Sequence, residues 1–256
     1  MNLIIKILVI FIISTVTVAR EKGETEITTE DGIEVYQNEK YYLLKKNVKI
    51  ESDNFILKAE DDVKINFKDS LYNITKLEAK GNVKFNSSTL NIQGFGKILN
   101  YEVEIEKLKV KGVGSKFITE DLTMYSDGFI EVNNINGNFS LKGTNSKLKN
   151  ENILIIAQSI DGIFSSNNND NLNEITLLNI EDEKISYVKN SNTEMYAKKI
   201  NFDNISSLIE LIDDVTIIRD GEKISGDYGT LDTLNNSYKI KSNDQTKVKV
   251  IIQNNE

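Results

Sequence analysis

The sequence predicts an all-β fold built from many short antiparallel strands. Three observations along the 256 residues support this prediction: apolar and polar residues alternate in many runs, turn-forming pairs separate these runs, and a weak repeat of strand-like segments recurs. A period of two places successive side chains on opposite faces of a sheet, so that one face is buried and the other is wet. Many short strands with regular turns indicate a sandwich, a roll or a barrel.

The alternation is clearest after residue 30. In the run 102–106 glutamates alternate with Val103 and Ile105, and Leu108 and Val110 continue the pattern. Similar runs stand at 48–50, 63–67, 83–85, 139–141, 215–217 and 248–250. The best candidate for a helix, 206–212, is short and directly precedes a strand-like run.

Asp-Gly, Asn-Gly and Gly-Asn pairs predict the turns between strands, because both positions of such a pair tolerate positive φ. These pairs stand at 31–32, 81–82, 127–128, 136–137, 161–162 and 220–221. The polar tract 165–171 is predicted to form the longest loop, and it could mark a seam between two tandem halves.

The composition argues against an enzyme. The chain contains no His and no Cys, so neither the common nucleophile–base pairs nor the usual zinc sites can be built. The paired carboxylates Asp61-Asp62 and Asp213-Asp214 are expected to be polar positions at the start of strands. No catalytic residue, metal or cofactor is therefore predicted. A net charge of −8 without a basic cluster also argues against binding to nucleic acid.

The N-terminal residues 1–19 are predicted to be a signal peptide. Lys6 precedes the unbroken apolar run 7–13, and small, weakly polar residues follow up to Ala19. This run is short for a membrane span, and small residues precede a plausible cleavage site after Ala19. The mature protein is expected to be exported, with an uncleaved membrane anchor as the alternative.

One phrase recurs along the chain. The segment 79–83, Ala-Lys-Gly-Asn-Val, leads into a strand, and Gly94-Phe-Gly follows it. A second copy runs from 208 to 217 and is followed by Gly226 with Tyr228-Gly229, and a third begins at Asn47-Val48. Repeats of a few strands each suggest stacked β-units that share one long core.

These phrases resemble the OstA-like unit of the periplasmic lipopolysaccharide-transport proteins LptA, LptC and LptD, and the chain is most similar to LptA. The resemblance covers 25–252. It implies an antiparallel half-open β-jelly-roll, or "β-taco", of stacked strand repeats in the periplasm. Acyl chains of lipopolysaccharide would lie in an apolar trough, so that the protein carries the lipid from the inner to the outer membrane. It further implies pairing of terminal strands with LptC-like and LptD-like proteins, and head-to-tail self-association.

The predicted trough consists of apolar residues on the inward face of the strands. The candidates are Val48, Ile50, Phe55, Leu57, Val83, Phe85, Leu90, Ile92, Val103, Ile105, Leu108, Val110, Val215 and Ile217. The candidates for pairing with a partner's strand at the two ends are Ile33, Val35, Tyr42, Leu44, Val248 and Val250. Lysines beside Val248 and Val250 are also typical of an edge that is merely protected against aggregation.

Two other functions remain open from the sequence. The same apolar face would form an ordinary dry core in an exported structural or adhesive β-repeat protein. An enzyme that cleaves polysaccharide with carboxylates alone is disfavoured, since the chain lacks Trp for stacking against sugars.

Overall fold

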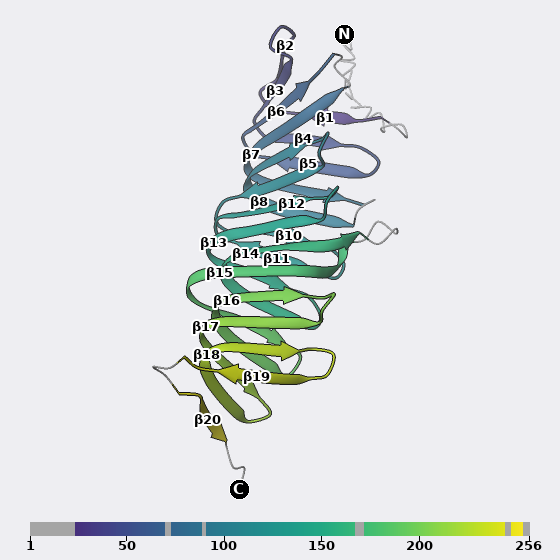
Figure 1. Ribbon diagram of the computed structural model, residues 1–256. Helices are drawn as coiled ribbons and strands as arrows, with labels where there is room; N and C mark the ends of the chain where they lie inside the picture. The colour runs from purple at the N-terminus through teal and green to yellow at the C-terminus, as the bar shows by residue number, and fades with distance from the viewer. Residues whose placement is uncertain (1–23, 70–72, 89–90, 167–171, 244–246, 253–256) are drawn as a thin grey trace, which may run out of the picture.

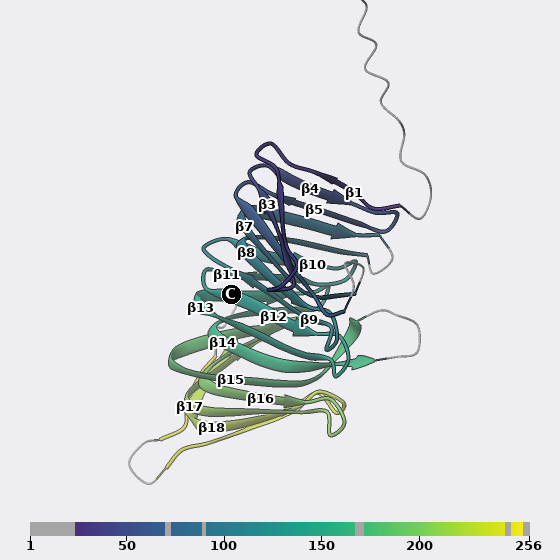
Figure 2. The same ribbon diagram turned by 90° about the horizontal axis from the view of Figure 1, so that it is seen from above.

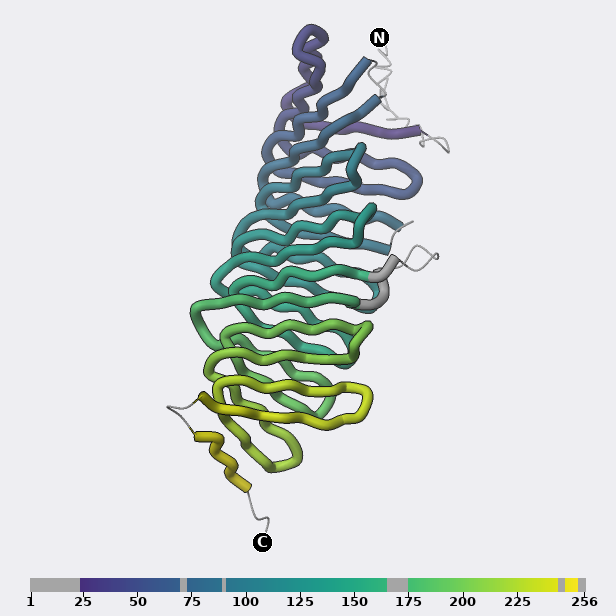
Figure 3. Tube along the Cα trace, in the orientation of Figure 1, coloured from purple at the N-terminus to yellow at the C-terminus, as the bar shows by residue number. Residues whose placement is uncertain are grey.

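The protein folds into one long antiparallel sheet that is bent over on itself. The computed structural model describes residues 24–69, 73–88, 91–166, 172–243 and 247–252. Within them lie twenty strands in a single hydrogen-bonded sheet, and no helix. No segment of the described chain is therefore a helix that could span a membrane. The strands stack along the long axis, from β1 and β2 at one end to β19 and β20 at the other (Figures 1 and 3).

The strand bounds are β1 (Glu26–Thr28), β2 (Ile33–Tyr36), β3 (Tyr41–Lys45), β4 (Val48–Glu51), β5 (Phe55–Ala59), β6 (Asp62–Phe67), β7 (Ile74–Ser87), β8 (Ile92–Glu102), β9 (Lys107–Lys111), β10 (Ser115–Ile118), β11 (Thr123–Ser126), β12 (Phe129–Asn133), β13 (Asn138–Lys149), β14 (Ile153–Ser166), β15 (Leu172–Asn190), β16 (Thr193–Asp203), β17 (Leu208–Arg219), β18 (Glu222–Asp232), β19 (Ser237–Lys241) and β20 (Lys249–Ile252).

The sheet has two layers, defined by the strand pairings. Layer A runs from β1 through β4, β5, β10 and β11 to β20, and layer B runs from β2 through β3, β6, β9 and β12 to β19. The long strands β7, β8 and β13–β18 contribute one half to each layer. Seen from above, the bent strands fan round the long axis (Figure 2). The predicted all-antiparallel β fold is confirmed.

The two layers join along one side, which we call the spine. There the chain passes from one layer to the other, either through short links such as 46–47 and 60–61 or through irregularities inside the long strands. Neighbouring bends are hydrogen-bonded to each other: Asn47 N–H donates to the Glu60 carbonyl (2.9 Å), and Glu60 N–H donates to the Gly81 carbonyl (2.6 Å). The bends at the N-terminal end of the spine are therefore tied to one another by backbone hydrogen bonds.

Three of these bends explain the repeated phrase of the sequence. Lys46-Asn47, Gly81-Asn82 and Asp213-Asp214 each have positive φ at both positions. Each pair is followed by a buried valine, namely Val48, Val83 or Val215. Asn, Asp and Gly tolerate this backbone region better than other residues do. The phrase thus encodes a two-residue bulge at the spine that returns the next valine to the interior.

The bends in β14 and β15 are held by one carboxylate. Asp182 accepts hydrogen bonds from the backbone N–H of Gln158 (2.6 Å) and Ser159 (2.9 Å), and from the hydroxyl of Ser186 (2.7 Å). The two N–H groups lie in the stretch of β14 where pairing with β15 is interrupted, between Ile156 and Asp161. The side chain thereby replaces the ladder bonds that the bend removes.

On the side opposite the spine, hairpin turns connect neighbouring strands within each layer. The turns of layer A, which we call rim A, include 52–54, 119–122, 150–152, 191–192 and 220–221. The turns of layer B, which we call rim B, include 103–106, 134–137, 204–207 and 233–236. The layers are thus continuous with each other at the spine and end separately at the two rims.

The predicted turns have different outcomes. Asp220-Gly221 forms the predicted two-residue hairpin turn, with Arg219 paired to Glu222. Gly81-Asn82 and Asp161-Gly162 are not turns, because both pairs lie inside long strands. Gly162 is needed there for space, since a Cβ on it would lie 2.4 Å from the ring of Phe139 on the neighbouring strand.

Three further expectations concern the candidate helix, the longest loop and the signal peptide. The best candidate for a helix, 206–212, is not helical, because 204–207 form a turn and β17 starts at Leu208. Of the predicted loop 165–171, residues 167–171 lie outside the described residues, and the two flanking strands pair in both layers. The proposed division into tandem halves stays a prediction. The predicted signal peptide also lies outside the described residues.

We predict that Asp182→Ala lowers the free energy of unfolding by about 1–3 kcal/mol, because two partly buried backbone N–H groups lose their acceptor. Urea unfolding measures this change. The control is Asp161→Ala, whose exposed carboxylate pairs with Lys142 at 3.5 Å and whose loss should cost less than about 1 kcal/mol. Equal effects of the two substitutions would contradict a special role for Asp182 at the spine.

Candidate functional site

The predicted trough residues mostly face the space between the two layers. Eight of them are buried, with side-chain exposures of 6% or less: Val48, Ile50, Leu57, Val83, Phe85, Val110, Val215 and Ile217. Phe55, Ile92 and Leu108 are half-buried and pack against this core. These residues come from both layers, so the interior is a single apolar surface folded onto itself.

Phe85 illustrates how tightly the interior is filled. It is paired with Gly94 across the β7–β8 ladder, and its ring covers the space that a side chain on Gly94 would occupy. Phe139 covers Gly162 in the same way in layer B, and its ring stacks on Phe164 with centroids 4.3 Å apart. Both aromatic rings are thus fixed parts of the core.

Val103 and Ile105 do not lie where the alternation predicted. Residues 103–106 form the rim B turn between β8 and β9, and the two side chains are 37% and 42% exposed. Apolar and polar residues can alternate in a tight turn just as they do in a strand. For this reason the alternation wrongly predicted that Val103 and Ile105 face the interior. The trough candidate Leu90 lies outside the described residues.

A small apolar cavity lies between the layers in the C-terminal half. Its volume is about 30 Å³, which is far too small for an acyl chain. Layer A contributes residues from β14 and β15, and layer B contributes residues from β15, β16 and β17. The lining residues are Ile153, Ile155, Ile175, Leu178, Val188, Asn190, Ile200, Phe202 and Ile209.

None of these cavity residues was among the predicted site residues. The relevant signal was present in the sequence, because 153–157 and 175–180 are rich in Ile and Leu. The phrase that marks the spine is absent from this part of the chain, so the two halves of each long strand were not recognised there. The residues facing the cavity therefore extend the candidate site to the C-terminal half.

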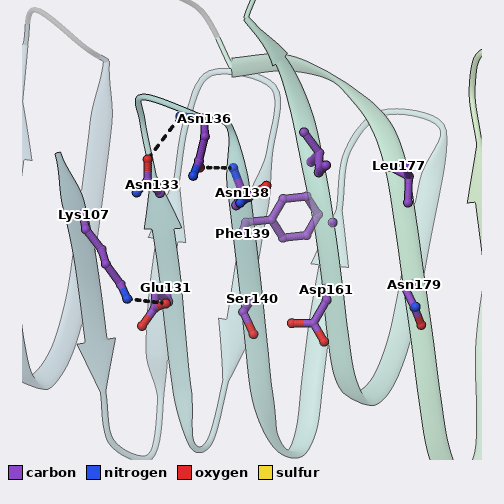
Figure 4. A pocket seen from close by; sticks show the side chains of 12 residues that line it. Lys107, Glu131, Asn133, Asn136, Asn138, Phe139, Ser140, Asp161, Leu177 and Asn179 are labelled. Atoms are coloured by element: carbon purple, nitrogen blue, oxygen red, sulfur yellow. Dashed lines mark hydrogen bonds and ion pairs between the residues drawn. The ribbon is translucent and has the colours of Figure 1, made fainter. Parts of the chain in front are cut away.

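A second hollow, of about 470 Å³ and with both polar and apolar lining residues, lies on the outer side of layer B (Figure 4). Glu131, Ser140, Asp161 and Asn179 occupy paired positions on successive strands and alternate with buried residues, so they point outward. Asn133 and Asn136 border the hollow at the rim B turn 134–137. Inside that turn the Asn133 side chain accepts a hydrogen bond from the Asn136 N–H at 3.1 Å.

The charged groups of this hollow are neutralised by neighbours. Glu131 forms ion pairs with Lys107 and Lys109, each at 2.9 Å. Partial burial raises the pKa of Glu131, but the hydrogen bonds and charges of the two lysines outweigh it and hold the pKa below its ordinary value. A carboxylate that stays ionised cannot serve as the general acid of a glycosidase. The described residues also contain no group of three or more acidic side chains that could hold a metal ion.

The predicted pairing residues divide between terminal and inner strands. Ile33 and Val35 are each 47% exposed on β2, the last strand of layer B at its N-terminal end. Val250 lies on β20, the last strand of layer A at the other end, and Val248 directly precedes it. Tyr42 and Leu44 lie on β3, which is paired on both sides, and Leu44 is fully buried. The placement of Tyr42 and Leu44 on an edge is therefore wrong.

Comparison with known proteins gives similarity in structure but not in sequence. No protein-family model and no curated protein matches the sequence. Among solved structures, the chain is similar to LptH from Pseudomonas aeruginosa, described as the LptA-homologous periplasmic component of the lipopolysaccharide transport device. The TM-score is 0.42 and the identity 14%, over 52% of this chain and 95% of LptH.

We predict that Val103→Asp changes the free energy of unfolding by no more than about 0.5 kcal/mol, because the side chain stands in an exposed turn. Val110→Asp, on the strand that follows this turn, should cost more than about 3 kcal/mol or prevent folding, because it buries a carboxylate without a partner. Thermal unfolding of the two variants measures the difference. A strongly destabilised Val103→Asp protein would contradict the placement of 103–106 at rim B.

Proposed function

We propose that the protein is a periplasmic carrier that holds the acyl chains of lipopolysaccharide between its two layers. The observation that carries this proposal is the shape of the apolar surface. The inward faces of layers A and B are apolar along the described length of the sheet, and the layers are joined by strand backbone at the spine. A surface of this kind suits a long, thin apolar ligand better than a compact one.

The lipid would have to separate the layers from the rim side. The interior residues are packed and the cavity between the layers is small, so an acyl chain would replace contacts between layers with contacts to itself. Each CH₂ group that leaves water contributes about 0.8 kcal/mol, which offsets the lost packing over a long chain. The protein itself performs no chemistry in this function.

The terminal strands suit transfer between proteins. β1 and β2 end the two layers on one side, and β19 and β20 end them on the other. Exposed apolar side chains, including Ile33 and Val35 on β2 and Ile251 and Ile252 on β20, accompany these edges. LptC-like and LptD-like proteins, or further copies of the chain, would extend the sheet by strand pairing and bridge the inner and outer membranes.

A second candidate function is favoured by the same packing. An exported structural or adhesive β-repeat protein would need a core that stays dry, and the 37 buried apolar residues found among the described part of the chain would serve this purpose without any ligand. The two functions differ in whether the layers part when lipid is present.

We predict a one-to-one or higher adduct between residues 20–256 and purified lipopolysaccharide in native mass spectrometry. Val188→Phe should reduce this binding by about tenfold, because the larger side chain fills the cavity without adding charge. The control is Ile185→Phe at an exposed position of the spine. Circular dichroism confirms that both variants fold.

Two results would contradict the carrier function. A folded wild-type protein without any adduct would favour the structural β-repeat protein. An adduct that is equally stable in wild type and Val188→Phe would place the lipid outside the cavity region.

A further inference from the structure

The two rims differ in the side chains at the tips of their turns. Rim B carries an exposed aliphatic residue in four of its described turns: Ile105, Ile135, Ile205 and Leu234, with exposures of 42%, 61%, 94% and 80%. The described turn 37–40, between β2 and β3 at the N-terminal end of rim B, carries polar side chains instead. In the described turns of rim A no large apolar side chain is exposed, and the tips carry acidic or amide side chains such as Asp53, Glu120, Glu151 and Asp220. The asymmetry follows one edge of the interior from β8 to β19.

The backbone of these turns does not need the aliphatic residues. In three of the turns an Asn or Asp at the end of the preceding strand accepts a hydrogen bond from the N–H of the aliphatic residue. The pairs are Asn133 with Ile135 (3.0 Å), Asp203 with Ile205 (2.9 Å) and Asp232 with Leu234 (3.0 Å). Such Asx turns form with a polar residue at the next positions equally well. The aliphatic side chains are therefore free to serve another purpose.

The row is narrow and leads into the interior. Turns that follow one another along layer B are two strands, or roughly 10 Å, apart, and this is the spacing from Ile105 to Ile135 and from Ile205 to Leu234. Ile135 and Ile205 are four strands, or roughly 20 Å, apart, so the four tips form a line one side chain wide with a longer interval in its middle. Just inside this line lie Tyr101, Leu108 and Phe202, which are half-buried and pack on the core. Burial and the nearby Glu106 raise the pKa of Tyr101, so its hydroxyl stays neutral. The apolar surface thus continues from the exposed tips to the core.

The chemistry of the row favours one occupant. A protein partner needs an area of roughly 800 Å² on each side, which a single file of side chains does not supply. Glu104 and Glu106 flank Ile105, and the net charge of −8 makes an anionic surface unfavourable. A flexible hydrocarbon chain is thin enough to lie along the row and carries no charge.

We propose that Ile105, Ile135, Ile205 and Leu234 form a strip that takes hold of an acyl chain at rim B before the chain passes between the layers. This inference rests on the proposed function as a lipid carrier. It assigns the strip a role in how fast lipid is loaded, and the interior a role in how tightly lipid is held.

The test uses residues 20–256 and lipopolysaccharide with a fluorophore on its sugar, mixed by stopped flow. A variant with Ile105→Thr, Ile135→Thr, Ile205→Thr and Leu234→Thr should load about tenfold more slowly, because the chain loses its first apolar contacts. The amount bound at saturation should stay within about twofold of wild type, since the interior is unchanged. The control variant, Val113→Thr with Ile185→Thr, removes two exposed aliphatic residues at the spine and should load at the wild-type rate.

The possible failures are distinguishable. Equal loading rates in wild type and strip variant, with lipid bound by both, would overturn the strip and leave the carrier function intact. A wild-type protein that takes up no lipid would overturn both. A strip variant that differs from wild type in oligomeric state on sedimentation, but not in loading rate, would assign the strip to contact between copies of the chain.

Discussion

The fold depends on the requirement that each strand keep an apolar face inward on both sides of the spine. In β7, Leu77 and Ala79 face inward before the bulge at Gly81-Asn82, and Val83 and Phe85 face inward after it. In β16 the inward face passes from Ala197 to Ile200, an odd step that only an irregular bend permits. A slip of one residue turns a whole strand face outward, so the bends determine which residues form the interior. The hydrogen bonds of Asp182 and the pairs of positive-φ residues maintain this register.

The sequence was sufficient for the β class, for the inward position of residues near the spine and for the hairpin turn at Asp220-Gly221. It was insufficient where one local pattern serves two structures. The alternating residues 102–106 lead into a turn and not along a strand. Asp161-Gly162 lies inside a strand, where the ring of Phe139 occupies the space beside the glycine. The interior residues of β14 and β16 escaped prediction because their period changes at the bend. Leu44 was placed on an edge, since pairing between β3 and the distant β6 leaves no local signal.

The same architecture explains why a packed core and lipid carriage are compatible. Layers A and B are separate sheets at the rims and continuous at the spine, so the least costly way to admit a chain is to part them from the rim side. The interior contacts in the closed form are non-directional apolar contacts, which hydrocarbon can replace. The ion pairs of Glu131 and of Lys198–Asp214 lie on an outer face and at the spine, where parting of the rims leaves them intact. At the C-terminal end two hydrogen bonds cross between the layers near the rims, from Arg219 to the Asn236 carbonyl (3.1 Å) and from the Tyr238 hydroxyl to Glu222 (3.1 Å), and these would have to break if the rims part there.

The central claim is that lipid separates the two rims, and an inter-rim distance tests it most directly. The chain has no native cysteine, so spin labels at Asn192→Cys on rim A and Ser206→Cys on rim B report this distance alone. A pair at Asn152→Cys and Asn192→Cys, both on rim A, is the control. We expect pulsed electron paramagnetic resonance to show a longer distance between the rims with lipopolysaccharide and no change within rim A. An unchanged inter-rim distance in protein that carries stoichiometric lipid would contradict the account.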